Sequence, residues 1–144
     1  MKRITAYVLA LVLTCFCVSS VAGAYYADVP GSSALAGEVE KAVRYGLMNG
    51  YSQAQFGYSD TMTRAQFLVV LTRMLGWQTP STEEADADIT PAMALPEELS
   101  SQYRYAIACA AAHDVIEKTE PFRPNSPATR AEMAELLVRA LGLK

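Results

Sequence analysis

The chain contains one sequence unit twice, and this internal repetition constrains its fold more than any other feature. Residues 56–77 align without a gap with residues 122–143, and eight of these 22 positions are identical. Further upstream the offset becomes 68, and Asp28-Val29 resembles Asp88-Ile89 at the front of each copy. Self-similarity at a period of this length is typical of repeated supersecondary units.

Each copy is predicted to form a loop, a helix, a second loop and a second helix, so the expected fold class is all-α. Apolar residues at helical spacing predict the first helices over about 33–45 and 96–112. Leucines on one face predict the second helices over 64–75 and 130–141, and we expect these leucines to be core residues. Glycines follow both second helices and are typical helix ends.

The N-terminal residues 1–24 are predicted to be a cleaved secretory signal peptide. Lys2 and Arg3 precede an apolar run of 15 residues, and Ala22-Gly23-Ala24 offers a cleavage site. The run is shorter than the roughly 20 residues that a membrane-spanning helix needs, so we expect no membrane attachment after cleavage. The predicted organisation is therefore a signal peptide (1–24), a first repeat (25–77), an acidic linker (78–87) and a second repeat (88–144).

Charge and reactive side chains exclude several classes of function. Without Lys2 and Arg3 the net charge changes from −3 to −5, which argues against a nucleic-acid partner. Cys109 is the only cysteine outside the signal peptide, so no internal disulfide is expected, and its apolar surroundings predict a buried side chain. His113 is the only histidine and is expected at a helix end, on the surface or capping. The sequence shows no activated nucleophile and no metal-ligand cluster, so we expect neither an enzyme nor a cofactor.

The two second helices begin with the same local signal. Thr63 lies three residues before Gln66, and Thr129 lies three residues before Glu132. This spacing predicts a capping box, in which the Thr hydroxyl accepts from a backbone N–H and the Gln or Glu side chain accepts from the Thr N–H.

The arginine inside each capping motif needs a separate explanation. Arg64 and Arg130 fall in the first helical turn, where a cation is unfavourable by roughly 0.3–1 kcal/mol. Two explanations are open. An internal carboxylate such as Asp28, Asp60 or Asp88 could neutralise the arginine, or the arginine and the free N–H groups could bind an external anion.

The order of these features resembles the S-layer homology (SLH) repeat of bacterial cell-surface proteins. An Asp-Val opening, a helix, a "GLMNGY" turn, a Phe, "TRAQF" or "TRAEM" and "LVRALG" carry the resemblance, which covers residues 25–77 and 88–144. It implies helix pairs, three of which usually form a pseudo-threefold prism. Two repeats would therefore form an incomplete prism.

The resemblance also implies a function at the cell wall. The grooves between repeats of this family bind anionic secondary cell-wall polysaccharide, commonly pyruvylated, and so attach secreted proteins to the surface without catalysis. It favours the external anion as the partner of the motif arginines. An alternative is a structural subunit that dimerises or docks on other SLH proteins without binding glycan. The implied glycan-binding residues are Arg64, Arg130, Asp28, Asp88, Gly50 and Tyr51.

Overall fold

The structure, a computed structural model, describes residues 26–77 and 87–143. The predicted signal peptide and all but the last residue of the predicted linker lie outside these ranges. Within them the chain is helical, with a single isolated bridge and no strand, so the all-α class is confirmed. Unit one (residues 26–77) contains α2 (Ala36–Arg44) and α3 (Arg64–Leu75), and unit two (residues 87–143) contains the 3₁₀ helix η1 (Pro91–Met93), α5 (Ser101–Ala112) and α6 (Arg130–Ala140).

The second helix of each unit matches its predicted position, whereas the first helices are shorter than predicted. α3 has the predicted bounds, and α6 ends one residue early. α2 fills only the middle of the range 33–45. The prediction that α5 begins near Pro96 was wrong, because the Pro96 carbonyl accepts a hydrogen bond from Leu99 N in a turn and the helix begins at Ser101.

Both predicted capping boxes are confirmed. At α3, Gln66 N donates to Thr63 Oγ1 (3.3 Å) and Thr63 N donates to Gln66 Oε1 (2.8 Å). At α6, Glu132 N donates to Thr129 Oγ1 (3.2 Å) and Thr129 N donates to Glu132 Oε2 (2.8 Å). Each pair satisfies backbone donors that a helix start otherwise leaves open.

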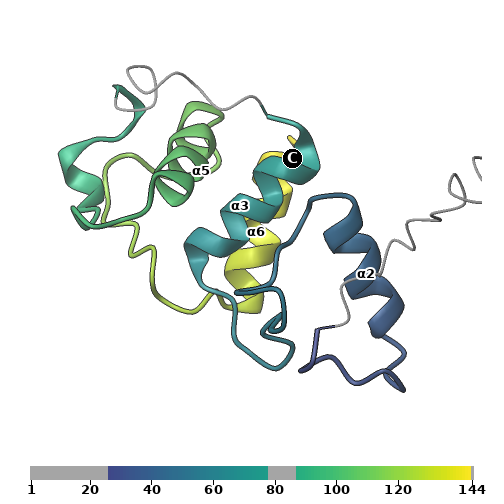
Figure 1. The fold of residues 1–144 in the computed structure, drawn as a ribbon. Helices are drawn as coiled ribbons and strands as arrows, with labels where there is room; N and C mark the ends of the chain where they lie inside the picture. Colours follow the sequence, from purple (N-terminus) through teal and green to yellow (C-terminus); the bar gives the residue numbers. More distant parts are fainter. Residues whose placement is uncertain (1–25, 78–86, 144) are drawn as a thin grey trace, which may run out of the picture.

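The core lies between the two units. In Figure 1, α3 and α6 are drawn at the centre, between α5 and α2. α3 of unit one packs against α5 of unit two. Burial of apolar side chains from both units is therefore what holds the repeats together. The largest fully buried side chains are Leu68, Leu71, Met93, Ile107 and Val115.

Backbone hydrogen bonds also join the start of α3 to the segment before α6. These two backbone segments form an antiparallel bridge between Thr63 and Pro127. Two of the first N–H groups of α3 are satisfied by unit two, so this helix start is closed to an external anion. The bonds run from Arg64 N to Ser126 O (2.9 Å), from Ala65 N to Pro124 O (3.0 Å) and from Ala128 N to Met62 O (3.0 Å).

The loops that precede α3 and α6 share one backbone conformation. Gly57 and Arg123, at matching positions, both have a positive φ, of 86° and 56°. The turn that follows is the same: Asp60 N donates to Gly57 O (3.0 Å), and Ser126 N donates to Arg123 O (3.2 Å). The two units are therefore repeats in structure as well as in sequence.

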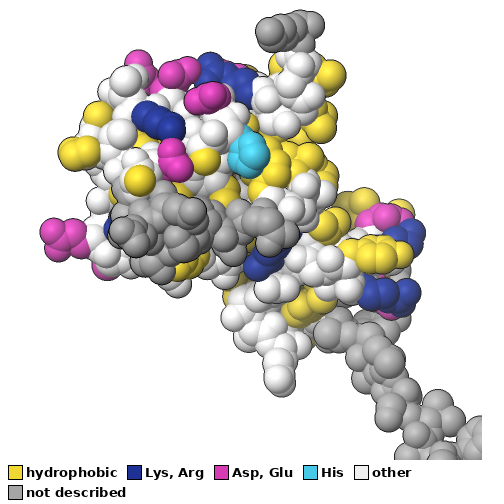
Figure 2. Space-filling view, turned by 90° about the horizontal axis from the view of Figure 1, so that it is seen from above, with side chains coloured by type: hydrophobic (Ala, Val, Ile, Leu, Met, Phe, Trp, Pro, Cys, Tyr) yellow, Lys and Arg dark blue, Asp and Glu magenta, His cyan; other side chains and the backbone are white. Residues whose placement is uncertain are grey.

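The first helices of the two units differ in burial. α5 has six buried residues, among them Ile107, whereas α2 has none, and the matching Val39 is only half-buried. α2, at the right in Figures 1 and 2, carries charged side chains of both signs at its surface. Two exposed ion pairs, Lys41–Glu38 and Arg44–Glu40, belong to it.

We predict that Thr63→Ala and Thr129→Ala each lower the free energy of unfolding by about 1 kcal/mol, because each removes an N-terminal cap. Urea unfolding followed by circular dichroism measures both. Thr119→Ala, in an exposed loop outside the helices, is the control and should leave the midpoint unchanged. Unchanged midpoints for both capping variants would contradict the prediction.

Candidate functional site

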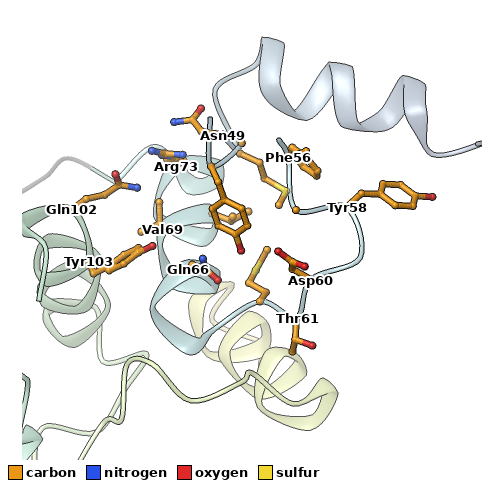
Figure 3. Close-up of a pocket in the computed structure, with 16 residues that line it drawn as sticks. Asn49, Phe56, Tyr58, Asp60, Thr61, Gln66, Val69, Arg73, Gln102 and Tyr103 are labelled. Carbon is orange, nitrogen blue, oxygen red and sulfur yellow. The ribbon is translucent and has the colours of Figure 1, made fainter. Parts of the chain in front are cut away.

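A groove of about 390 Å³, called groove one here, lies between unit one and α5. Figure 3 shows its lining side chains, with Gln102 and Tyr103 of unit two on one side of α3 and Phe56 and Asp60 on the other. Gly50 and Tyr51, two of the predicted site residues, both line it. Its lining consists of residues 48–51, 56–58 and 60–62, the α3 residues Gln66, Val69, Val70 and Arg73, and Gln102 and Tyr103.

The lining of groove one combines aromatic rings with polar groups, of which Asp60 and Arg73 are charged. Tyr51 and Tyr103 supply rings with hydroxyl tips, and Asn49 and Gln102 supply amides that both donate and accept. The Tyr58 ring points away from the groove, and its hydroxyl is hydrogen-bonded to Ser33 Oγ (2.7 Å) (Figure 3). Such walls suit a ligand that has apolar faces and hydroxyl edges, as a sugar ring does.

Gly50 shapes the turn at the edge of groove one. A Cβ at this position would lie 2.4 Å from Tyr26 Cε1 and 2.6 Å from the Gln55 carbonyl oxygen. Gly50 N also donates to the Tyr26 hydroxyl (3.2 Å). Any side chain here would displace the turn, so the role of Gly50 is to let Tyr26 approach the backbone.

Arg73 is the only cation of groove one, and no carboxylate among the described residues lies within ion-pair distance of it. One of its guanidinium nitrogens donates to the Leu47 carbonyl (3.4 Å). The side chain is thereby oriented while its charge stays uncompensated. A guanidinium in this state is suited to bind an external carboxylate through paired hydrogen bonds.

The matching arginine of unit two, Arg139, has its charge compensated by two carboxylates. Arg139 Nη1 lies 2.9 Å from Glu117, and Arg139 Nη2 lies 2.9 Å from Glu135. At the positions of these two glutamates, unit one has Asn49 and Val69. Arg73 was not among the binding residues predicted from the sequence. Comparing the two copies position by position would have revealed its missing partners.

A second groove, of about 190 Å³ and called groove two here, is the counterpart of groove one in unit two. One side chain of unit one, Arg64, reaches into it. Two arginines face four glutamates in this lining, so the groove is acidic overall and disfavours an anionic ligand. Its lining consists of Arg64, residues 115–117 and 120–122, Glu132, Glu135, Leu136 and Arg139.

Arg64 is packed within groove two. Its guanidinium carbon lies 4.7 Å from the centre of the Phe122 ring, a cation–π contact. Its Nε lies 3.7 Å from Glu132 Oε1 and is buried without a hydrogen-bond partner in the described part of the chain. The internal carboxylate near Arg64 is therefore Glu132, and none of the three aspartates considered from the sequence.

Glu132 is held mainly by the capping box. The backbone N–H of Thr129 and then its hydroxyl lower the pKa of the Glu132 carboxyl, and the positive charge of Arg64 adds a smaller contribution in the same direction. The carboxylate therefore stays charged at neutral pH beside the buried guanidinium.

Arg130 is exposed at the start of α6 and lines neither groove. It has no ion pair within residues 26–77 and 87–143. Its backbone N–H and that of Ala131 make no hydrogen bond to any described residue. The two motif arginines thus occupy different environments: Arg64 is enclosed by unit two, and Arg130 faces outward.

The two opening aspartates are engaged in the fold. The Asp28 carboxylate accepts from Phe56 N (2.8 Å), Gly57 N (2.7 Å) and Tyr58 N (3.0 Å), and so holds the loop that borders groove one. These hydrogen bonds, that of Phe56 first, lower the pKa of Asp28. Asp88 pairs with Lys118 Nζ (2.7 Å). The structure brings Gly50 and Tyr51 together, but it places neither aspartate and neither motif arginine in groove one.

Other reactive side chains have structural positions. His113 follows α5, is exposed, and stacks on Trp77 with ring centres 4.1 Å apart, beside the hydrophobic side chains visible in Figure 2. Cys109 is buried, as predicted, and burial raises the pKa of its thiol. The described residues contain no group of three or more metal-ligating side chains. Every helix in the described ranges is too short or too polar to cross a membrane.

The fold and the two grooves together define an all-helical repeat module. Each groove is lined by residues of both repeats. The chain belongs to the S-layer homology domain family, whose sequence model matches residues 25–68 and 99–134, more than half of the chain. It is 26% identical over 151 residues to a cell surface protein of Thermoanaerobacter kivui. That alignment covers 100% of this chain and 19% of the relative, so the chain spans about a fifth of its length. No solved structure matches the chain.

We predict that Asp28→Asn lowers the melting temperature by more at pH 7 than at pH 3. The folded state depresses the pKa of Asp28, so this carboxylate stabilises the fold above its unfolded pKa of about 4. That contribution is lost as the pH falls through the lower folded value. Asp114→Asn, in an exposed turn, is the control. An Asp28→Asn difference that is equal at both pH values would contradict the assignment.

Proposed function

We propose that the protein is a non-catalytic cell-envelope module that binds anionic secondary cell-wall polysaccharide, through a ketal-linked pyruvate, in groove one. The observation that carries this proposal is Arg73, a partly buried guanidinium in the groove with no carboxylate partner in the described part of the chain. Membership of the S-layer homology family supports it, and so does the relative described as a cell surface protein.

The chemistry of groove one fits such a ligand. The planar fork of Arg73 would bind the pyruvate carboxylate, and Asn49 and Gln102 would hydrogen-bond sugar hydroxyls. Tyr51 and Tyr103 would cover the apolar faces of the sugar. Gly50 and Asp28 act indirectly, since they fix the turn and the loop that border the groove.

Groove two is the weaker candidate. Its volume is about half that of groove one, and its arginines already face carboxylates. In this proposal Arg64 serves mainly to hold unit two against unit one, and Asp88 pairs with Lys118 within unit two. An anionic sugar could bind there only by displacing Glu132 from Arg64 or Glu117 and Glu135 from Arg139.

We predict that Arg73→Gln weakens binding to purified secondary cell-wall polysaccharide about 10- to 100-fold, since a hydrogen bond to a charged group contributes about 1.5–3 kcal/mol. The matched Arg139→Gln should leave the affinity nearly unchanged. Isothermal titration calorimetry measures both. Polysaccharide from which the ketal pyruvate has been removed should bind the parent protein as weakly as intact polysaccharide binds the variant. Equal losses for the two variants would contradict the choice of groove one.

Co-sedimentation with cell-wall sacculi tests whether the motif arginines Arg64 and Arg130 contribute to binding. The Arg64→Ala/Arg130→Ala double variant should sediment less completely with cell-wall sacculi than the parent protein, either because it loses an anion contact or because it loses the Arg64 contact that holds unit two. Sedimentation equal to that of the parent would remove both arginines from the binding site while leaving Arg73 to be judged by calorimetry.

A second candidate function is assembly, in which the protein docks on a copy of itself or on another SLH protein without binding glycan. The exposed start of α6, whose counterpart in unit one is buried, favours it. The two functions are compatible, because an association between copies can coexist with an open groove.

A further inference from the structure

We infer that two copies of this chain associate head to tail. Unit one of one copy docks on unit two of the other copy. The contact is the same as the one that unit two makes with unit one within a single chain. In this arrangement Arg130 of one copy enters groove one of the next. The template is the contact inside the chain. The association itself does not depend on the proposed glycan.

The first support is a set of backbone groups in unit two that have no hydrogen-bond partner among the described residues, although their counterparts in unit one do. Within the chain, Arg64 N, Ala65 N and Met62 O pair with the segment before α6. Their counterparts in unit two are Arg130 N, Ala131 N and Ala128 O, and none of these three makes a hydrogen bond to a described residue. Buried helix starts in native proteins have their N–H groups satisfied, so the buried start of α3 shows how the open start of α6 would be covered.

The segment that would cover them is present in unit one. Tyr58 O, Asp60 O and Met62 N correspond to the three groups of unit two that pair with α3, and they too have no hydrogen-bond partner among the described residues. This loop already has the required conformation, with the same positive φ and the same turn as its counterpart. Each copy therefore carries both halves of the contact.

The apolar surfaces follow the same pattern. Ala65, Leu68 and Thr72 of α3 are covered and at most 9% exposed. Their counterparts on α6 are exposed, and Val138, which matches Thr72, is 46% exposed. Leu141 and Leu143, which follow α6, are 53% and 59% exposed. An apolar face of this kind beside open backbone donors is typical of an interaction surface.

The helix that would cover α6 is α2. Within the chain α3 is covered by α5, and α2 is the counterpart of α5. Val39, Ala42 and Val43 match residues of α5 that are fully buried, yet each is only half-buried and α2 has no buried residue. Docking on α6 of a second copy would bury these side chains and explain their apolar character.

The docking would also complete groove one. Groove two contains Arg64 from the neighbouring unit in addition to the residues of unit two. Groove one lacks the corresponding residue, because no unit precedes unit one in the described residues. The same relation between copies would place Arg130 of a second copy in groove one, near Arg73. This part of the inference rests on the proposed function, since a second guanidinium matters there only if the ligand is an anion.

The backbone pairing specifies a disulfide test. Thr63 and Pro127 face each other within the chain, and paired antiparallel residues have Cα atoms about 4.5–5.5 Å apart, within the range for a disulfide. The corresponding residues between copies are Thr129 and Thr61, both exposed. Two proteins are prepared, one with Thr61→Cys and one with Thr129→Cys. Cys15, Cys17 and Cys109 are replaced by Ser, Ser and Ala in both.

Mild oxidation of an equimolar mixture should give the mixed disulfide as the main cross-linked product, identified by peptide mass spectrometry. The Thr63→Cys/Pro127→Cys double variant should form an intramolecular disulfide and is the positive control. Ala112→Cys mixed with Thr129→Cys is the negative control, since Ala112 is exposed away from the proposed contact. A mixed disulfide no more abundant than in the negative control would overturn the inference.

Sedimentation velocity without any cysteine substitution gives an independent measurement. Ala131→Arg should raise the dissociation constant of self-association at least about tenfold, equivalent to 1.4 kcal/mol, because it places a charge in the contact. Ala112→Arg should not. Ala131 is exposed in the single copy, so folding is unaffected. A parent protein that stays monomeric at tens of micromolar would also overturn the inference.

Arg130→Gln separates the association from the glycan site. It should lower the affinity for polysaccharide more than it weakens self-association, because the backbone hydrogen bonds of Arg130 and the apolar contact between α6 and α2 are kept. Unchanged affinity together with intact association would reject Arg130 in groove one and keep the interface. Loss of binding by Arg73→Gln but not by Arg130→Gln would localise the site to one copy.

Discussion

The docking of unit two on the start of α3 is the contact on which the rest of the structure depends. It buries Ala65 and Leu68, satisfies the first N–H groups of α3, and places α5 against this helix. The wall of groove one that comes from unit two exists only because α5 is held there. The same contact brings Phe122 beneath Arg64. Core, helix capping and grooves are thus consequences of one association between two similar sequences.

The two grooves are built from the same repeat, but they differ in how the charge of their arginine is compensated. The grooves share most of their architecture, but Glu117 and Glu135 compensate the arginine of unit two, whereas Asn49 and Val69 leave Arg73 uncompensated. Arg139 and its partners are partly exposed, so their ion pairs contribute little to stability. Their main effect is to occupy the guanidinium. Two differences in sequence, Asn49 for Glu117 and Val69 for Glu135, leave the arginine of groove one without the ion pairs that its counterpart makes.

Local signals were predictable from the sequence, and contacts between the units were not. The capping motifs located the starts of α3 and α6, because a cap needs only residues three positions apart. The turn at Pro96 makes α5 begin later than predicted, at Ser101. This turn depends on a hydrogen bond to the Pro96 carbonyl, which helix propensities do not predict. Glu132 was assigned to its cap, but its proximity to Arg64 arises only when the units dock. Gly50 and Tyr51 do line a groove, but their role in binding stays a prediction. Arg73 was not considered as a binding residue, because its lack of carboxylate partners becomes visible only when the two copies are compared position by position. The prism arrangement stays a prediction.

The burial of α5 rather than α2 has a consequence for the order of folding. A chain that emerges from its N-terminus presents α2 and α3 first, yet the helix that covers α3 ends only at Ala112. Unit one alone therefore has few contacts with which to offset its loss of conformational entropy. The emerging chain should stay open until about three quarters of it is available and then close in one step, with α2 as the last helix to gain protection from hydrogen exchange.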